Sequence, residues 1–149
     1  MMHFASRSDP ARILCVEEDV VQRKLLQACL DVAGADALFA AGATQALTLF
    51  RRNHLDLVLM DFDLHAAAEL AAFEIMRYDG HVPILAVTDN ECRWTEEDYR
   101  EAGFTGLYVK PIEPSRLIAA MDGAMRLAGR APLLSDPQGR FEDRAAYFH

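Results

Sequence analysis

Short apolar runs alternate with longer stretches of helical period between residues 11 and 128. The apolar runs predict strands at 12–16, 36–40, 56–60, 82–87 and 107–109. Helices are predicted at 20–33, 43–53, 66–78 and 114–127, together with one that has a capped start at 95–98 and ends at Gly103. This repeated βα order predicts an α/β fold in which helices surround a parallel sheet.

The apolar positions also predict how deeply each element is buried. Strand 56–60 is apolar on both faces, as expected of a central strand, whereas 36–40 is weaker and is predicted to lie at the sheet edge. The inner stripe predicted for helix 20–33 consists of Val21, Leu25, Ala28, Cys29 and Val32; that of helix 43–53 consists of Ala46, Leu47 and Phe50. Pro114 suits the first position of the last helix.

Four of the predicted strands run directly into polar residues. The first runs into the acidic segment 17–19, and the others run into Asp61, Thr88 and Lys110. The carboxyl ends of parallel strands lie at one edge of a sheet, where ligands bind. We therefore expect carboxylates, a hydroxyl and an ammonium group to converge there, although they are far apart along the chain.

Composition narrows the possible functions. A chain of 149 residues is expected to form one domain, and its net charge of −8 argues against sequence-independent binding to nucleic acid. The three cysteines form no CxxC pair, which argues against a metal or redox centre. No apolar run has the length of a signal peptide core or a membrane span, so we expect a cytoplasmic protein without membrane insertion.

The predicted elements divide the chain into three parts. Residues 1–10 are expected to be an N-terminal extension, 11–128 the domain, and 129–149 a C-terminal tail. Within the tail, Phe141, Ala145 and Phe148 are spaced to share one face of a short helix. A frayed terminus is the more common outcome for such a segment.

The polar residues at the strand ends are suited to phosphoryl transfer. A carboxylate such as Asp61 can act as the nucleophile and form an acyl phosphate, provided that the charge on the transferring oxygens is neutralised. Lys110 can neutralise part of this charge, and the Thr88 hydroxyl can donate to another oxygen. Mg²⁺ prefers oxygen ligands. The candidate ligands are the carboxylates of Glu17, Glu18 and Asp61 and the backbone carbonyl of Asp63.

These motifs resemble a known family. Val16-Glu17-Glu18-Asp19, the strand that ends in Asp61, the strand that ends in Thr88, and Val109-Lys110-Pro111 look like the receiver domain of bacterial two-component response regulators. The Glu101-Ala102-Gly103 step before the last strand also fits. The resemblance covers about 11–128 and depends on four motifs that occur in the right order on the right elements.

The resemblance implies a doubly wound, flavodoxin-like sheet of five parallel strands in the order 2-1-3-4-5. It also implies Mg²⁺-dependent phosphorylation of Asp61 by a histidine kinase or phosphotransfer protein, with a conformational change that spreads from Thr88. Such a protein would act as a stand-alone receiver that signals through contacts with a downstream protein. Its only chemistry would be self-phosphorylation and autodephosphorylation. A cis bond before Pro111 is also implied.

Three residues depart from the family pattern. Glu18 stands where an aspartate usually binds the metal directly, and its extra methylene moves the carboxylate by roughly 1 Å in a site that demands near-octahedral geometry. Leu107 stands in place of the usual switching aromatic residue, and Asp89 replaces a small residue beside the phosphoryl position. The loop after Asp61 also differs from the usual pattern.

Two alternative functions remain open. These departures favour a degenerate receiver that binds proteins without phosphorylation. More distantly, Asp61-Phe62-Asp63 with Thr88 and Lys110 resembles a haloacid-dehalogenase-like phosphatase. That family usually opens on the Asp-x-Asp strand and carries its acidic pair after the lysine, whereas here the acidic segment comes before Asp61.

Overall fold

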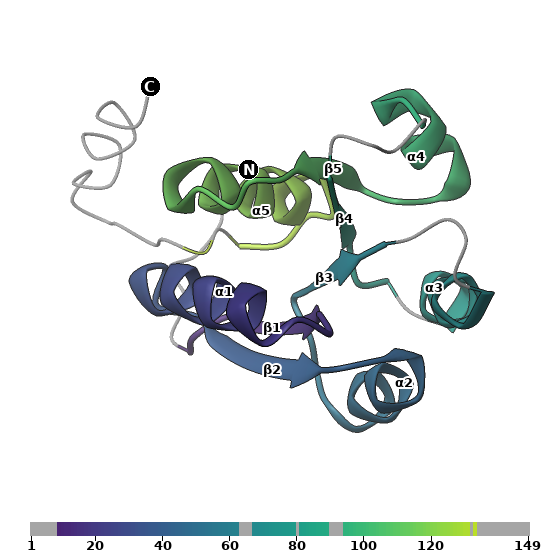
Figure 1. The fold of residues 1–149 in the computed structure, drawn as a ribbon, viewed down its shortest axis with the longest axis horizontal. Coiled ribbons are helices and arrows are strands. Elements are labelled where there is room, and N and C mark those ends of the chain that lie inside the picture. The colour runs from purple at the N-terminus through teal and green to yellow at the C-terminus, as the bar shows by residue number, and fades with distance from the viewer. Residues whose placement is uncertain (1–8, 63–66, 80, 90–93, 132, 134–149) are drawn as a thin grey trace.

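The computed structural model describes residues 9–62, 67–79, 81–89, 94–131 and 133 (Figure 1). Its strands are β1 (Arg12–Val16), β2 (Asp36–Ala40), β3 (Leu57–Asp61), β4 (Ile84–Thr88) and β5 (Gly106–Val109). Its helices are α1 (Val20–Val32), α2 (Ala43–Arg52), α3 (Ala67–Asp79), α4 (Glu96–Ala102) and α5 (Pro114–Leu127). These bounds agree with the sequence prediction to within two residues at every strand and helix end that the prediction specified.

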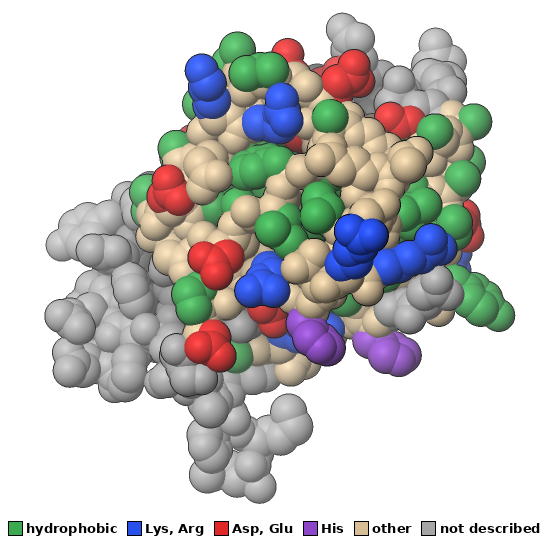
Figure 2. Space-filling model, turned by 90° about the horizontal axis from the view of Figure 1, so that it is seen from below, with side chains coloured by type: hydrophobic (Ala, Val, Ile, Leu, Met, Phe, Trp, Pro, Cys, Tyr) green, Lys and Arg blue, Asp and Glu red, His purple; other side chains and the backbone are tan. Residues whose placement is uncertain are grey.

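All neighbouring strands of the sheet pair in parallel, in the order β2-β1-β3-β4-β5. The predicted doubly wound fold is therefore confirmed, with α1 and α5 on one face and α2, α3 and α4 on the other (Figure 1). The central strand β3 is buried along its first four residues, whereas β2 lies at the sheet edge and is only partly buried. Seen from the side where β2 and α2 lie in Figure 1, hydrophobic side chains reach the surface between charged ones (Figure 2).

Local sequence signals define several helix ends. Thr95 caps α4 in a reciprocal capping box with Asp98, and Gly103 ends this helix with a left-handed φ of 116°. Asp19 caps α1, since its Oδ1 accepts from the backbone N–H of Gln22 at 2.9 Å. Pro114 occupies the start of α5, where its missing N–H removes no helical hydrogen bond.

The inner face predicted for α1 was largely wrong. Leu26, Cys29 and Leu30 are buried, whereas Val21 and Val32 are exposed. Both sets of residues have helical spacing, so α1 carries two apolar stripes of which only one faces the sheet. Periodicity identified the helix but could not identify which stripe packs against the neighbouring elements.

The two core layers differ in composition. The layer under α1 and α5 is mainly aliphatic and includes Leu59, Leu85 and Met121. The layer on the opposite face contains a cluster of aromatic rings, formed by Phe62, Phe73, Trp94, Tyr99 and Phe104. Within this aromatic cluster, Phe73 and Phe104 stack with centroids 3.8 Å apart. The cluster begins at Phe62, directly after the end of β3, and extends to the start of α4.

Candidate functional site

Asp61 is the last residue of β3, which lies between β1 and β4 at the centre of the sheet. Asp61 pairs in register with Val87, so Thr88 follows one residue further along β4. Directly after β5, the backbone N–H of Lys110 donates to the carbonyl of Thr88 at 2.7 Å. The strand ends therefore meet at one edge of the sheet, as the parallel topology requires.

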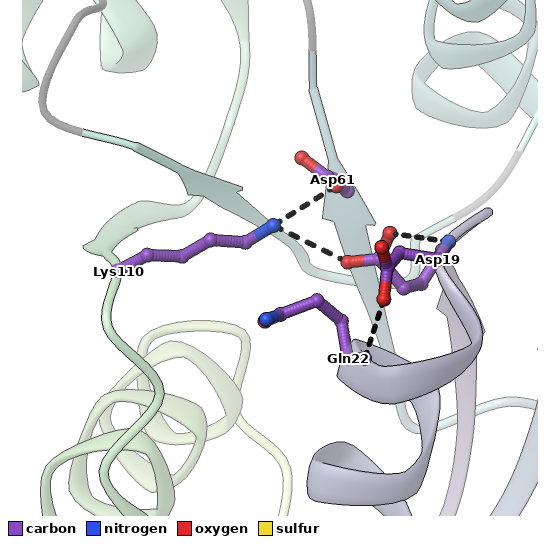
Figure 3. Close-up of polar contacts among 5 residues, drawn as sticks. Asp19, Gln22, Asp61 and Lys110 are labelled. Carbon is purple, nitrogen blue, oxygen red and sulfur yellow. Dashed lines mark hydrogen bonds and ion pairs between the residues drawn. The ribbon is translucent and has the colours of Figure 1, made fainter.

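Lys110 joins two carboxylates that come from different strands. Its Nζ lies 3.1 Å from Oδ2 of Asp61 and 3.3 Å from Oε1 of Glu17. Figure 3 shows the lysine side chain extending across the strand ends towards Asp61. The convergence predicted from the sequence thus holds for Glu17, Asp61 and Lys110.

The three acidic residues after β1 are placed differently. Glu17 is buried, and its Oε2 accepts from the backbone N–H of Asp19 at 3.1 Å. Asp19 is committed to capping α1, as the dashed contact to Gln22 in Figure 3 shows. The side chain of Glu18 is exposed. Of these three residues, Glu17 is therefore the one whose carboxylate lies in the site. Asp19 fixes the first turn of α1 next to Glu17.

Burial and neighbouring charges shift the pKa values of both Glu17 and Lys110. Burial raises the pKa of the Glu17 carboxyl, and the neighbouring Asp61 adds to this effect, while the backbone N–H of Asp19 and the ammonium of Lys110 oppose it. Burial alone would lower the pKa of Lys110, but the hydrogen bond and charge of Asp61, together with the charge of Glu17, raise it above its ordinary value. Lys110 is therefore a stable cation at neutral pH.

Access distinguishes the two carboxylates. The side chain of Asp61 is 34% exposed, whereas that of Glu17 is 3% exposed. A reagent in solution can therefore reach Asp61, while Glu17 supports Lys110 from inside. Thr88 is buried at the end of β4, next to the strand that carries Asp61.

The segment after β5 is held by a residue that the sequence reasoning did not assign to the site. The hydroxyl of Tyr108 donates to the carbonyl of Pro111 and accepts from the backbone N–H of Glu113, each at 2.8 Å. The Lys110–Pro111 bond is cis, as the resemblance implied. Tyr108 packs into the aliphatic layer and Leu107 into the opposite one, as strand alternation predicts.

Gln22 is a second residue that the sequence reasoning missed. Its side chain extends from the first turn of α1 towards Lys110 (Figure 3). Among the described residues, its Oε1 is the buried side-chain polar atom without a hydrogen-bond partner. A glutamine in an otherwise ordinary helical turn gives no sequence signal for such a position.

The donor set partly fits a magnesium ion. Glu17 and Asp61 supply carboxylate oxygens around a shared cation, and Mg²⁺ is commonly held by one or two carboxylates together with water and phosphate. Within the described part of the chain, however, no three His, Cys, Asp or Glu side chains are grouped so that they could hold a metal ion. Glu18 therefore does not complete such a group with Glu17 and Asp61. The predicted ligand Asp63 lies outside the described residues.

The sequence model of one protein family, the response regulator receiver domain, matches residues 13–122 of this chain. Because this match covers more than half of the sequence, the chain belongs to the response regulator receiver family, whose members act in two-component signalling. The resemblance noted from the four motifs is thereby confirmed. Among the described residues, no helix has the length and apolar character needed to cross a membrane.

Similar proteins include two polar-differentiation response regulators named DivK. The chain is 29% identical to DivK of Brucella ovis over 109 residues, which cover 71% of this chain and 89% of that protein. It is 29% identical to DivK of Brucella anthropi over 112 residues, which cover 73% of this chain and 91% of that protein.

Solved structures show the same fold. A response regulator receiver domain protein from Clostridium thermocellum gives a TM-score of 0.71 at 18% identity and covers 80% of this chain and 97% of its own. The chemotaxis response regulator CheY4 of Vibrio cholerae gives a TM-score of 0.64 at 24% identity and covers 74% of this chain and 94% of its own. These similarities establish the arrangement of strands and helices.

Proposed function

We propose that Asp61 accepts a phosphoryl group from a histidine kinase or a phosphotransfer protein, and that the modified domain signals through contacts with a downstream protein. The observation that carries this proposal is the contact between an accessible carboxylate on the central strand and Lys110, at 3.1 Å. Such a pair places a nucleophile next to the cation that its phosphorylated form requires.

The side chains have separate roles in the transfer. An oxygen of Asp61 forms a bond to phosphorus while the bond from phosphorus to the donor nitrogen breaks, and the electron pair stays on that nitrogen. Lys110 remains protonated and moves part of its interaction from Glu17 and Asp61 to a phosphoryl oxygen. Thr88, at the end of the adjacent strand, donates its hydroxyl to another phosphoryl oxygen.

A magnesium ion belongs to this proposal. Glu17 and Asp61 would hold it, with the carbonyl of Asp63 as a further candidate ligand; Glu18 would join them only by turning inward from its exposed position. When bound, such an ion neutralises negative charge on the phosphoryl oxygens. Glu17 and Asp61 place two carboxylates beside the single ammonium group of Lys110, so the site has an excess of negative charge that favours a cation.

The test is phosphorylation by a small donor. The protein is incubated with acetyl phosphate and millimolar Mg²⁺, and its intact mass is measured. We expect a gain of one phosphoryl group that disappears in Asp61→Asn. Asp36→Asn is the matched control. Asp36 is an exposed carboxylate at the start of β2, whereas Asp61 lies at the end of β3, so loss of the Asp36 carboxylate should leave the mass gain unchanged.

A degenerate receiver is the second candidate function. The exposed position of Glu18 and the lack of a three-residue metal group among the described residues favour it. It predicts no mass gain at millimolar Mg²⁺ and no heat of Mg²⁺ binding by calorimetry. That pair of results would overturn the phosphorylation proposal and leave the protein-binding role.

A further inference from the structure

Four apolar side chains form a row on the outer face of α1. Val21, Leu25 and Val32 are 65%, 43% and 61% exposed, and Ala28 is also exposed. Their spacing of four, three and four residues places them on one stripe of the helix. With a rise of about 1.5 Å per residue, this α1 row is about 16 Å long.

After α5 the chain turns towards the segment that precedes β3. Gly129 turns the backbone with a φ of 73°, and the guanidinium of Arg130 then donates to the carbonyl of Leu55 at 3.1 Å and lies 3.4 Å from a carboxylate oxygen of Asp56. Leu55 and Asp56 directly precede β3, so this contact fixes the turn at the edge of the sheet opposite to Asp61.

Leu133 shows the direction of the chain after this turn. Its backbone N–H donates to Oδ1 of Asp122 at 2.9 Å, and its side chain is buried in the same core layer as Leu26 and Cys29 of α1. Asp122 lies within α5, before its end. The chain therefore reverses and runs back along α5 in the layer that α5 shares with α1.

The rest of the sequence has the length and pattern to cover the α1 row. Residues 134–149 contain Phe141, Ala145 and Phe148, which are spaced for one helical face. The eight residues from Leu133 to Phe141 can span up to about 26 Å when extended, which exceeds the length of the row. A helix over 141–148 would be about 10 Å long and would fit within it.

We propose that the C-terminal tail, residues 134–149, packs Phe141 and Phe148 against the α1 row formed by Val21, Leu25, Ala28 and Val32. The α1 row supplies exposed apolar surface, the tail sequence supplies two aromatic side chains at helical spacing, and Leu133 starts the tail in the core layer that includes residues of α1. This contact includes neither Asp61 nor Lys110, so it goes beyond the function proposed above.

Methyl NMR of the full chain tests this proposal. We expect nuclear Overhauser cross-peaks between the methyl groups of Val21, Leu25 and Val32 and the ring protons of Phe141 and Phe148. The double variant Phe141→Glu/Phe148→Glu should abolish these cross-peaks and shift the three methyl resonances. Tyr147→Glu is the matched control, because Tyr147 lies off the shared face and its substitution should leave them in place.

Reciprocal and dilution experiments complete the test. Leu25→Ser changes a surface residue, so the fold is retained, and it should shift the ring resonances of Phe141 and Phe148. Methyl resonances of the double variant that stay at their wild-type positions would overturn the proposal and leave the row free for another protein. Cross-peaks that vanish on dilution would also overturn it, because they would assign the contact to a second copy of the chain.

Discussion

The ammonium nitrogen of Lys110 lies 3.1 Å from a carboxylate oxygen of Asp61, and it also contacts Glu17 at 3.3 Å. One cation is therefore shared by two carboxylates that face each other at the end of β1 and β3. The contacts of Lys110 with Asp61 and with Glu17 do not contribute independently to stability, because the loss of the lysine leaves both negative charges in place. The first prediction follows from this arrangement.

Lys110→Met should lower the free energy of unfolding by about 1–3 kcal/mol, since it removes charge-assisted hydrogen bonds from a buried and a half-buried carboxylate. Urea unfolding at neutral pH measures this change. Adding Glu17→Gln to the variant should restore part of the loss, because one of the two facing charges is then gone.

Lys24→Met is the control for this series, because Lys24 is exposed on α1. It should change the free energy of unfolding by no more than about 0.5 kcal/mol. If the changes in unfolding free energy caused by the Lys110 and Glu17 substitutions were strictly additive, the ammonium group of Lys110 would not be coupled to the Glu17 carboxylate.

Trp94 should report on the phosphorylation proposed for Asp61. It is the one tryptophan of the chain, and its ring lies 6.2 Å from that of Phe62, the residue after Asp61. Acetyl phosphate with Mg²⁺ should change the tryptophan fluorescence at the rate of the mass gain, and Asp61→Asn should abolish both. A mass gain with constant fluorescence would show that the aromatic cluster does not respond to the site.

The stacked pair in the aromatic cluster should dominate the stability of its core layer. Phe104 is buried, and its ring stacks on Phe73 with an interplanar angle of 4°. Phe104→Ala should cost about 3–5 kcal/mol of unfolding free energy, measured by urea denaturation. Tyr78→Ala, at a residue that is 91% exposed, should change it by less than about 0.5 kcal/mol. Equal losses in the two variants would contradict the packing described here.

The buried thiols should make stability depend on pH in the alkaline range. Burial raises the pKa of Cys15 and of Cys29. The unfolded chain releases these protons above a pH of about 8.5, whereas the folded protein retains them. The contribution of these two thiols to the free energy of unfolding should therefore be constant at lower pH. The free energy of unfolding should fall as pH rises above this value.

Urea titrations at several pH values measure this slope, which should be smaller in Cys15→Ala. In a Cys92→Ser background, an aromatic disulfide reagent should react slowly with the native protein and rapidly after unfolding. Rapid reaction of two thiols in the native state would show that Cys15 and Cys29 are accessible.

Gln22→Met should leave the protein as stable as before or stabilise it by about 1 kcal/mol, because the unpartnered amide oxygen is replaced by an apolar group of similar shape. The control is Gln27→Met. Gln27 donates to Asp31 at the surface, so its loss should be close to neutral. A clear destabilisation by Gln22→Met in urea unfolding would indicate that the amide has a partner in solution.

The order of the elements could be predicted from the sequence because each βα unit carries its own signal. The apolar run of β3 and the change to helical period after it require no knowledge of the rest of the chain. The meeting of Asp61 and Lys110 was predictable for the same reason, since a parallel sheet places all carboxyl ends of its strands at one edge.

Side-chain directions were less predictable. In α1, Val21 and Leu26 both belong to apolar stripes, and only the packed structure shows that the stripe of Leu26 faces the sheet. Similarly, the sequence gives Glu17 and Glu18 equal standing, whereas the structure buries the first and exposes the second. Trp94 is partly buried and its ring packs against Tyr99, a contact that no local sequence pattern indicates.

The difference in composition between the two core layers predicts where this sequence can tolerate substitutions during evolution. Aliphatic side chains of similar volume replace one another at modest cost, so positions such as Leu85 and Met121 can exchange residues over time. Interlocked rings tolerate such exchange poorly, because each depends on the orientation of its neighbours. Substitutions should therefore accumulate on the side of α1 and α5, while the opposite side keeps its residues.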